Sequence, residues 1–408
     1  MRSGVTRVVV TGAGVVSPLG LTVPLYAAGL VEGRCAFAAP VVPRGEALAT
    51  RVVAQVSEFD PVRHFSDRDL MRLDRVSQFA VVAAREAVAQ SGLAFDGELG
   101  ERTAAIIGTG AGGQHTQDDN YHRIYAEGAR RLHPVTLPRA MFSAPASQVS
   151  MHVGIRGPTF AVSSACASST HAVGIALQML RSGAVDCAVA GGTEACLTFG
   201  ALRAWEALRV MAPDTCRPFS IGRQGLVLGE GAAIVVLERL EDALRRGATI
   251  LGEIAGFGMS ADAKDLVAPD DRGAARALAA ALADAGLSAG DVDYVNAHGT
   301  GTGVNDATET AAVKRAFGAH ASRLAISSIK SMIGHALGAA GALQLVATLT
   351  AIKAGVAPPT MNYLGPDPDC DLDYVPNQAR PMRIRAAILN SFGFGGLNAV
   401  LAVRRFDG

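Results

Sequence analysis

The chain has 408 residues, of which 49% are apolar and 46 are glycine, as is typical of a closely packed α/β protein with two or three domains. Its 37 basic residues balance 37 acidic ones, which excludes general nucleic-acid binding and leaves only local basic patches for partners. Six cysteines without a C-x-x-C pair give no disulfide framework and favour a reducing cytosol.

The N-terminus combines a basic start, residues 1–7, with the apolar run Val8–Val10, and superficially resembles a signal peptide. Because the run is short and breaks at Thr11, we predict instead a first core strand that turns at Gly12 and Gly14.

The most apolar long segment, residues 337–352, contains a glutamine and two threonines. It is shorter than a membrane-spanning helix. We therefore expect a cytoplasmic protein without membrane contact.

Short β-branched runs alternate with alanine-rich stretches. The runs 104–107, 186–190 and 232–237 are separated by helix-forming sequence, and this alternation predicts parallel sheets covered by helices. Residues 386–391 mirror the strand and glycine loop of the N-terminus. We expect two halves of similar plan with a boundary near Gly256.

One polar stretch, about residues 113–150, interrupts this alternation. It contains three prolines and the histidines His115, His122 and His133. The composition predicts an excursion from the core, in which these histidines are solvated loop residues.

Cys166 follows an apolar strand-like run and opens a helix rich in small residues, within residues 161–171 (AVSSACASSTH). The unpaired N–H groups and dipole of a helix N-terminus favour thiolate over thiol, and small neighbours let a substrate reach the sulfur. A buried structural cysteine is the alternative, because free cysteine is among the most buried residue types.

Two later segments favour a catalytic thiol. His298 lies in a glycine-rich turn after the strand-like run 292–295, and Glu309 follows on a predicted helix. Lys330 and His335 flank a turn that leads into a second small-residue helix. A lone histidine is usually structural, but one helix-opening thiol with two histidines in tight turns is difficult to attribute to packing.

These segments resemble the Cys-His-His active site of the β-ketoacyl-acyl carrier protein synthases, decarboxylating condensing enzymes of the thiolase superfamily. The resemblance extends from residues 8–20 to the closing loop 390–396. It implies an α/β thiolase-like fold in which two duplicated βαβ halves, residues 1–256 and 257–408, stack as a five-layer αβαβα sandwich.

The resemblance also implies roles for individual residues. The Cys166 thiolate takes an acyl group from acyl carrier protein, and the backbone amides of Cys166 and Phe394 meet the oxyanion. His298 and His335 hydrogen-bond the enolate that forms when malonyl-acyl carrier protein loses carbon dioxide. Lys330 orders the site and pairs with Glu309, although an ordinary ion pair is the alternative. The gating loop adds Phe392, Gly393 and Gly395. No metal-ligand spacing is present, and we expect no cofactor.

The acyl pocket and the docking surface are implied in the same way. The pocket residues are Ala111, which replaces a larger aliphatic residue of the housekeeping relatives, Trp205, and Thr136, which would reach a neighbouring subunit's pocket. An acidic carrier protein needs a basic patch, for which the candidates are Arg68, Arg72, Arg130, Arg131 and Arg209. A solvated helix face explains Arg68 and Arg72 equally well.

Three functions remain open. The first is the ketosynthase of a type II polyketide synthase, because the segments 305–312 and 366–376 resemble ketosynthase α subunits, while 205–220 resembles the nodulation protein E group. The second is a fatty-acid elongating synthase II. The third is a non-catalytic chain-length-factor subunit, which Cys166 argues against because such subunits lack the thiol. The chain would form a homodimer, or a heterodimer with a Cys-less chain-length factor.

Overall fold

The computed structural model describes residues 6–408, so the first five residues of the signal-peptide-like start lie outside it. Hydrogen bonds join ten strands in one mixed sheet with the order β3-β2-β4-β5-β1-β6-β12-β11-β7-β8. The first five are β3 (Thr159–Val162), β2 (Thr103–Gly108), β4 (Cys187–Glu194), β5 (Gly231–Arg239) and β1 (Val8–Val16); the others are β6 (Gly252–Ala261), β12 (Leu397–Arg404), β11 (Ala386–Gly393), β7 (Tyr294–Asn296) and β8 (Ala325–Ser327).

Reading outward from the junction of β1 and β6, the two halves of the sheet show the same pattern of strand pairs. β2 pairs in parallel with β3 and β4, and β7 pairs in parallel with β8 and β11. β4-β5-β1 and β11-β12-β6 are antiparallel, and β1 meets β6 at the junction. The prediction of parallel sheets is confirmed for the pairs of β2 and β7, but it was wrong for β1, β5, β6 and β12, which are joined by antiparallel pairs. Duplicated halves, as the resemblance implied, are confirmed.

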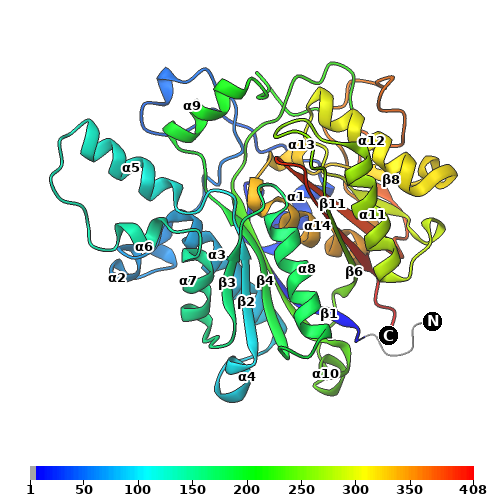
Figure 1. Cartoon of the computed structure of the whole chain (residues 1–408), viewed down its shortest axis with the longest axis horizontal. Helices are drawn as coiled ribbons and strands as arrows, with labels where there is room; N and C mark the ends of the chain where they lie inside the picture. Colours follow the sequence, from blue (N-terminus) through cyan, green and yellow to red (C-terminus); the bar gives the residue numbers. More distant parts are fainter. Residues whose placement is uncertain (1–5) are drawn as a thin grey trace.

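Helices form three layers around the two half-sheets (Figure 1). One outer layer packs α3 (Arg75–Ser91) and α7 (Ala144–Val153) on the N-terminal half, and the other packs α11 (Asp271–Ala285) and α12 (Gly303–Phe317) on the C-terminal half. Between the sheets lie α8 (Ser168–Arg181) and α14 (Ala340–Ala354). The remaining α-helices are α1 (Val23–Val31), α2 (Asp67–Leu70), α4 (Gly97–Glu101), α5 (Gln114–Tyr125), α6 (Thr136–Ala140), α9 (Phe199–Leu208), α10 (Leu240–Arg245) and α13 (Lys330–Ile333). β9 (Val356–Ala357) pairs with β10 (Arg380–Pro381).

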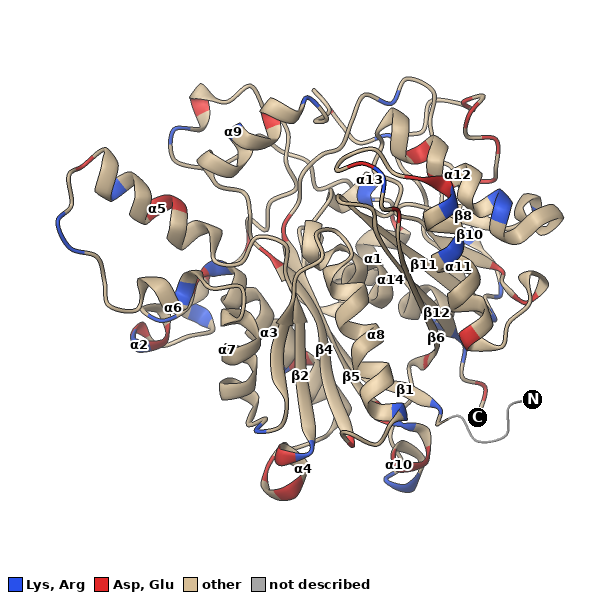
Figure 2. Ribbon diagram, viewed as in Figure 1, with Lys and Arg blue, Asp and Glu red and all other residues tan. Residues whose placement is uncertain are grey.

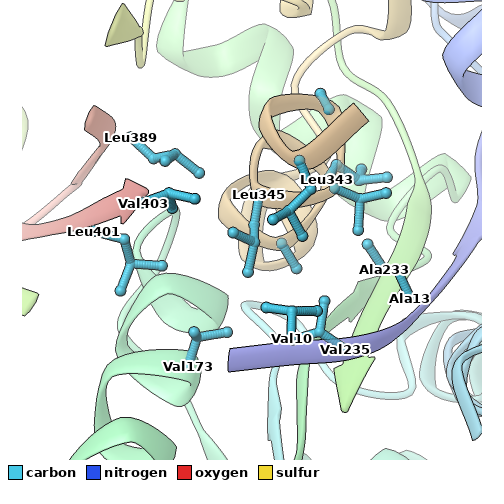
Figure 3. Packing of buried hydrophobic residues seen from close by; sticks show 14 of the residues in the cluster. Val10, Ala13, Val173, Ala233, Val235, Leu343, Leu345, Leu389, Leu401 and Val403 are labelled. Carbon is cyan, nitrogen blue, oxygen red and sulfur yellow. The ribbon is translucent and has the colours of Figure 1, made fainter. Parts of the chain in front are cut away.

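The apolar segment near the C-terminus belongs to the buried middle layer of helices. Residues Leu337–Ala354 are long and apolar enough to cross a membrane, with a mean hydropathy of 1.4 over 18 residues, so the prediction that this segment is too short was wrong. However, 83% of the segment is buried inside the protein, as expected of a core helix. Figure 3 shows Leu343 and Leu345 of α14 among Val10, Val235 and Leu389 of the two half-sheets.

The prediction that the first strand turns at Gly12 and Gly14 was wrong. β1 continues through Gly12 and Gly14 to Val16, with an irregularity in register only between Val10 and Gly12. A Cβ atom at Gly12 would lie 2.0 Å from the Ala87 carbonyl oxygen of α3. These glycines therefore permit close contact between strand and helix, not a turn.

The polar stretch 113–150 contains helices α5, α6 and the start of α7, and α5 with α6 form an arm beside the N-terminal half (Figure 1). α7 packs on α3 and buries Ala146 and Val149, so part of this stretch belongs to the core. His122 and His133 are exposed as predicted. His115 is not a solvated loop residue, because its Nε2 atom is buried on α5.

Candidate active site

Cys166 lies, as predicted, between the end of β3 and the start of α8. The preceding Ala165 has φ = 50°, in the left-handed region that a residue with a Cβ rarely adopts. Ser168 holds this bend, since its Oγ donates to the Ala165 carbonyl over 2.6 Å and accepts the Ser164 N–H over 2.9 Å. The strained turn presents the thiol at the end of the inner helix.

The tertiary fold brings the thiol and both histidines together. Cys166 Sγ lies 3.0 Å from His335 Nε2, and the rings of His298 and His335 meet almost perpendicularly with centroids 5.3 Å apart. His298 follows β7, and His335 follows α13 beyond β8. A thiol and two imidazoles from opposite halves of the chain thus share one buried site.

The thiol and the two imidazoles could also bind a metal ion together. Their spacing along the sequence gave no indication of this. Their donor atoms lie within 4.8 Å of one another. Lys330 lies close enough for its charge to lower the pKa values of all three groups. This buried cation would repel a divalent ion, so the residues present fit acyl-transfer chemistry better than metal binding.

Burial decides the protonation of the thiol. It raises the pKa of Cys166 to about 11, although the charge of Lys330 and the backbone N–H groups of Phe394 and Cys166 act in the opposite direction. The backbone N–H groups at the helix N-terminus favour the thiolate, but desolvation outweighs them here. The resting pair is a thiol beside an imidazole.

Both imidazoles are neutral. Burial, followed by the positive charge of Lys330, lowers the pKa of each ring well below its ordinary value, and His335 further lowers the pKa of His298. The Nδ1 atoms of both rings have no hydrogen-bond partner among the described residues. No neighbour fixes the proton at Nδ1 of either ring. His335 Nε2 faces the free Cys166 thiol and can accept its proton, and Nε2 of His298 can carry a proton or accept one.

Glu309 fixes the His298 loop and does not form the predicted ion pair with Lys330. Its carboxylate accepts the backbone N–H groups of His298 at 2.8 Å and Gly299 at 2.7 Å, and the Asn390 amide at 2.9 Å. These three donors occupy both oxygens. Among residues 6–408, no carboxylate lies within ion-pair distance of Lys330, and Glu309 acts on it only through its charge.

Gln344 of α14 is a site residue that the sequence did not reveal. Its Oε1 lies 3.5 Å from Lys330 Nζ, while its Nε2 donates to the carbonyl oxygens of Ala297 and Asn390. With this neutral partner, burial lowers the pKa of Lys330 to about 8. A glutamine within an apolar helix sequence gives no indication of such a contact.

Glu194, at the end of β4, is a second missed residue. It is fully buried and accepts the N–H groups of Gly110, Ala111 and Gly338 at 2.7, 3.1 and 2.9 Å. Burial raises its pKa to about 7, although these backbone donors oppose the shift. The carboxylate joins the loop after β2 to the turn after His335.

The closing glycine loop borders the thiol as predicted. Phe394 and Gly395 form the turn between β11 and β12, and a Cβ atom at Gly393 would lie 3.3 Å from the Cys166 nitrogen. The Phe394 ring stacks on Trp205 of α9 at 5.8 Å, and Phe392 contacts the His298 ring at 5.9 Å.

A cavity of about 510 Å³ gives access to the sulfur. Its wall includes Cys166, His298 and His335, the glycine loop and Trp205. Arg209 and Val304 also line it. Ala111 is outside this wall and packs on the apolar cluster that contains Cys166 and Leu337. Thr136 starts α6 on the arm and does not line the cavity of its own chain.

The five candidate docking arginines are exposed but are not one patch. Figure 2 shows basic residues on α2 and in the connection from α5 to α6, both on the arm side of the molecule. Arg68 lies on α2 and Arg72 lies two residues beyond its end, while Arg130 and Arg131 lie in the connection from α5 to α6. Arg209 ends α9 at the cavity, and none of the five is in an ion pair within the described range.

A thiol, two neutral imidazoles and a buried amine at the ends of duplicated βαβ halves define a condensing enzyme of thiolase-like fold. The family model for the N-terminal domain of beta-ketoacyl synthases matches residues 5–243, and that for the C-terminal domain matches residues 251–364. The chain therefore belongs to the beta-ketoacyl synthase family, which are acyltransferases that extend thioesters by condensation.

Its relatives include a nodulation protein, a 3-oxoacyl-[acyl-carrier-protein] synthase and a ketosynthase. Nodulation protein E of Rhizobium sp. (strain N33) is 50% identical over 98% of this chain and 99% of its own. 3-Oxoacyl-[acyl-carrier-protein] synthase 2 of Synechocystis sp. is 40% identical, with 98% of each chain covered. The solved structure of the ishigamide ketosynthase/chain length factor superimposes with a TM-score of 0.94 at 38% identity, over 98% of this chain and 100% of the other.

Proposed function

We propose that this synthase elongates a polyketide or polyene chain held on acyl carrier protein, with Cys166 as the nucleophile. The contact of 3.0 Å between Cys166 Sγ and His335 Nε2 supports this proposal most directly. A thiol with a raised pKa needs a base within hydrogen-bond reach, and the neutral His335 supplies one.

In the acylation step, Sγ bonds to the acyl carbonyl carbon while His335 Nε2 takes the thiol proton. The bond from that carbon to the carrier's sulfur then breaks, and the proton passes to the leaving thiolate. The oxyanion in between faces the N–H groups of Cys166 and Phe394, which also act on the Cys166 sulfur.

In the condensation step, malonyl-acyl carrier protein loses carbon dioxide, and the electron pair of the broken C–C bond forms an enolate. The Nε2–H tautomers of His298 and His335 donate to the enolate oxygen. The enolate carbon attacks the Cys166 thioester, and Sγ leaves as a thiolate. It takes up one proton from solvent, because its own proton left with the first carrier. A β-ketoacyl chain two carbons longer remains on the carrier.

The polyketide assignment rests on the likeness to the ishigamide ketosynthase and on the small Ala111, which packs on the apolar cluster that contains Cys166. A fatty-acid elongating synthase is the second candidate, favoured by the identity of 40% with a 3-oxoacyl-[acyl-carrier-protein] synthase. A chain-length-factor role without catalysis is disfavoured by the His335 contact of Cys166.

We also infer a dimer and a cytoplasmic location. β3 is an edge strand that exposes Phe160, and α7 beside it exposes Met151, as expected of a surface that a second subunit covers. The partner is a second copy or a Cys-less chain-length factor. All six cysteines are free thiols, which suits a reducing compartment.

Intact mass spectrometry tests the function. Wild type and Cys166→Ala are incubated with acyl-carrier proteins of increasing length and unsaturation, and then with malonyl-carrier protein. We expect an acyl adduct on wild type only, discharged as a product two carbons longer. No adduct with any donor, with or without a chain-length-factor partner, would contradict the proposal. Cys196→Ala, a buried neighbouring cysteine, is the matched control and should still form the adduct.

A further inference from the structure

His171 is the last residue of the small-residue run around Cys166, and the reaction steps proposed above do not use it. It lies in the first turn of α8 and is half-buried. Its ring meets the ring of Phe257 on β6 almost perpendicularly, with centroids 6.0 Å apart. The imidazole is therefore held beside the nucleophile, on the side of the inner helix.

The Nδ1 atom of His171 contacts two oxygen atoms of the chain that leads into α8. It lies 2.8 Å from Ser164 Oγ and 3.2 Å from the Ala167 carbonyl oxygen. Because a carbonyl oxygen can only accept, the ring carries its proton on Nδ1 and shares it between the two oxygens. Burial lowers the pKa of His171, which keeps the ring neutral with this single proton. The histidine thus binds the side chain of Ser164.

Ser164 lies directly before Ala165, the strained residue of the nucleophile turn. The Ser164 N–H donates to Ser168 Oγ at 2.9 Å, and its carbonyl oxygen accepts the Ala167 N–H at 3.1 Å. Within residues 6–408, the Ser164 hydroxyl has no hydrogen-bond partner other than His171. A strained backbone persists only where the surrounding contacts hold it, and the His171 contact is one of these.

The same turn contacts the glycine loop that carries the Phe394 N–H. A Cβ atom at Gly393 would lie 3.0 Å from the Ser164 carbonyl oxygen and 3.3 Å from the Cys166 nitrogen. Since Gly393 directly precedes Phe394, Ser164 borders both backbone donors that face the oxyanion. A shift of Ser164 would move the Cys166 N–H relative to the Phe394 N–H.

We propose that His171 is a positioning residue of the oxyanion hole: it holds Ser164, and through Ser164 it aligns the N–H groups of Cys166 and Phe394. The inference rests on the proposed function and deepens it, because it adds to the acylation step a residue that acts through another side chain. A misplaced donor stabilises the oxyanion less. Acylation should therefore depend on His171, whereas reactions of the thiol that form no oxyanion should not.

The test measures two reactions of Cys166 in the full chain by peptide mass spectrometry, which separates Cys166 from the exposed thiol of Cys35. Acylation by an acyl-carrier thioester forms an oxyanion, whereas alkylation by iodoacetamide displaces iodide without one. His171→Leu has a similar volume but no donor. We expect it to slow acylation about tenfold, the effect of one hydrogen bond. Alkylation should stay within about twofold of the wild-type rate, because it needs no oxyanion hole.

Three further variants distinguish positioning from packing. The asparagine amide carries its N–H groups on Cγ, where histidine carries Nδ1, so His171→Asn should recover most of the acylation rate. His171→Gln places its amide one bond further out and should not recover it. Ser164→Ala removes only the hydroxyl and should slow acylation as much as His171→Leu. The double variant should be no slower than either single one, because both changes remove the same hydrogen bond.

His320→Leu is the matched control. His320 is also half-buried and also bonds a carbonyl oxygen, that of Val292 at 2.9 Å, but it lies in the turn after α12. This variant should acylate Cys166 at the wild-type rate. Unchanged acylation in His171→Leu, an equal fall of acylation and alkylation, or additive losses in the double variant would overturn the inference, while the wild-type adduct still supports the proposed function. The absence of any adduct on wild type would overturn both.

Discussion

The two halves of this protein share one topology but supply different chemistry. In the N-terminal half, the chain leaves β3 through the strained turn at Cys166 and enters the inner helix α8. In the C-terminal half, it leaves β8 through Lys330 and His335 and enters the inner helix α14. The duplicated strand ends meet because α8 and α14 pack against each other between the half-sheets. One copy thus presents the nucleophile and the other the acid-base groups.

The halves also use a buried carboxylate in parallel ways. Glu309 accepts backbone N–H groups of the loop that carries His298, and Glu194 accepts those of the loop that carries Ala111. Neither is in an ion pair within the described range. In this arrangement the C-terminal carboxylate positions the loop of His298, while the N-terminal one joins the loop of Ala111 to the turn after His335.

We expect the largest loss of rate in the two histidine variants, each in a different step of the reaction. His335→Ala removes the base beside the thiol, so we expect about 10²- to 10³-fold slower acylation of Cys166. His298→Ala should leave acylation near the wild-type rate and slow condensation by a similar factor. Single-turnover mass spectrometry measures both steps. His320→Ala, a half-buried histidine in the turn after α12 of the same half, is the control. Equal loss of acylation in both site variants would contradict the division of roles.

Glu309→Gln should slow condensation about 10- to 100-fold. The carboxylate accepts three hydrogen bonds, from His298, Gly299 and Asn390. The glutamine has one oxygen in place of two, so one buried N–H would face an NH₂ group and lose its acceptor. Separate measurement of the acylation and condensation rates distinguishes positioning from general damage. We expect acylation to fall much less than condensation; an equal fall in both would indicate a merely structural role.

Glu194 should make stability depend on pH. Its folded-state pKa, about 7, exceeds the ordinary value of 4.5, so the folded state holds the proton more tightly than the unfolded state. The tightly held proton stabilises the folded state fully below about pH 4.5. As the pH rises to 7, this contribution is lost and the free energy of unfolding falls by about 3 kcal/mol. Denaturant titrations of wild type and Glu194→Gln at pH 5 and pH 8 check this. In Glu194→Gln, the free energy of unfolding should not fall in this way between pH 5 and pH 8. An equal fall in wild type and variant would contradict the prediction.

Arg209→Ala should have the smallest effect, about two- to fivefold on KM for the acyl-carrier substrate. Its exposed guanidinium lies at the open cavity, where it can attract an acidic carrier, and salt screens such contacts. The difference from wild type should shrink as ionic strength rises. Arg245→Ala, exposed on α10, is the control, and a salt-independent difference would argue against a docking role.

Much of the fold and the site residues followed from local sequence. β-Branched runs predicted the strands near 104–107, 186–190 and 232–237, and helix-opening small residues marked Cys166. Local sequence did not determine strand direction, so the antiparallel pairs of β1, β5, β6 and β12 were missed. It also misjudged Gly12 and Gly14, because a glycine required for close helix packing looks the same as a glycine in a turn.

The sequence by itself determined the family resemblance and the residue types of the catalytic trio, because these depend on short motifs. Only the tertiary structure decided their electrostatics. Burial, not the helix terminus, sets the pKa of Cys166, and the neutral Gln344 replaces the expected ion pair of Lys330. Desolvation and hydrogen-bond partners come from residues distant in sequence, so no local pattern contains them.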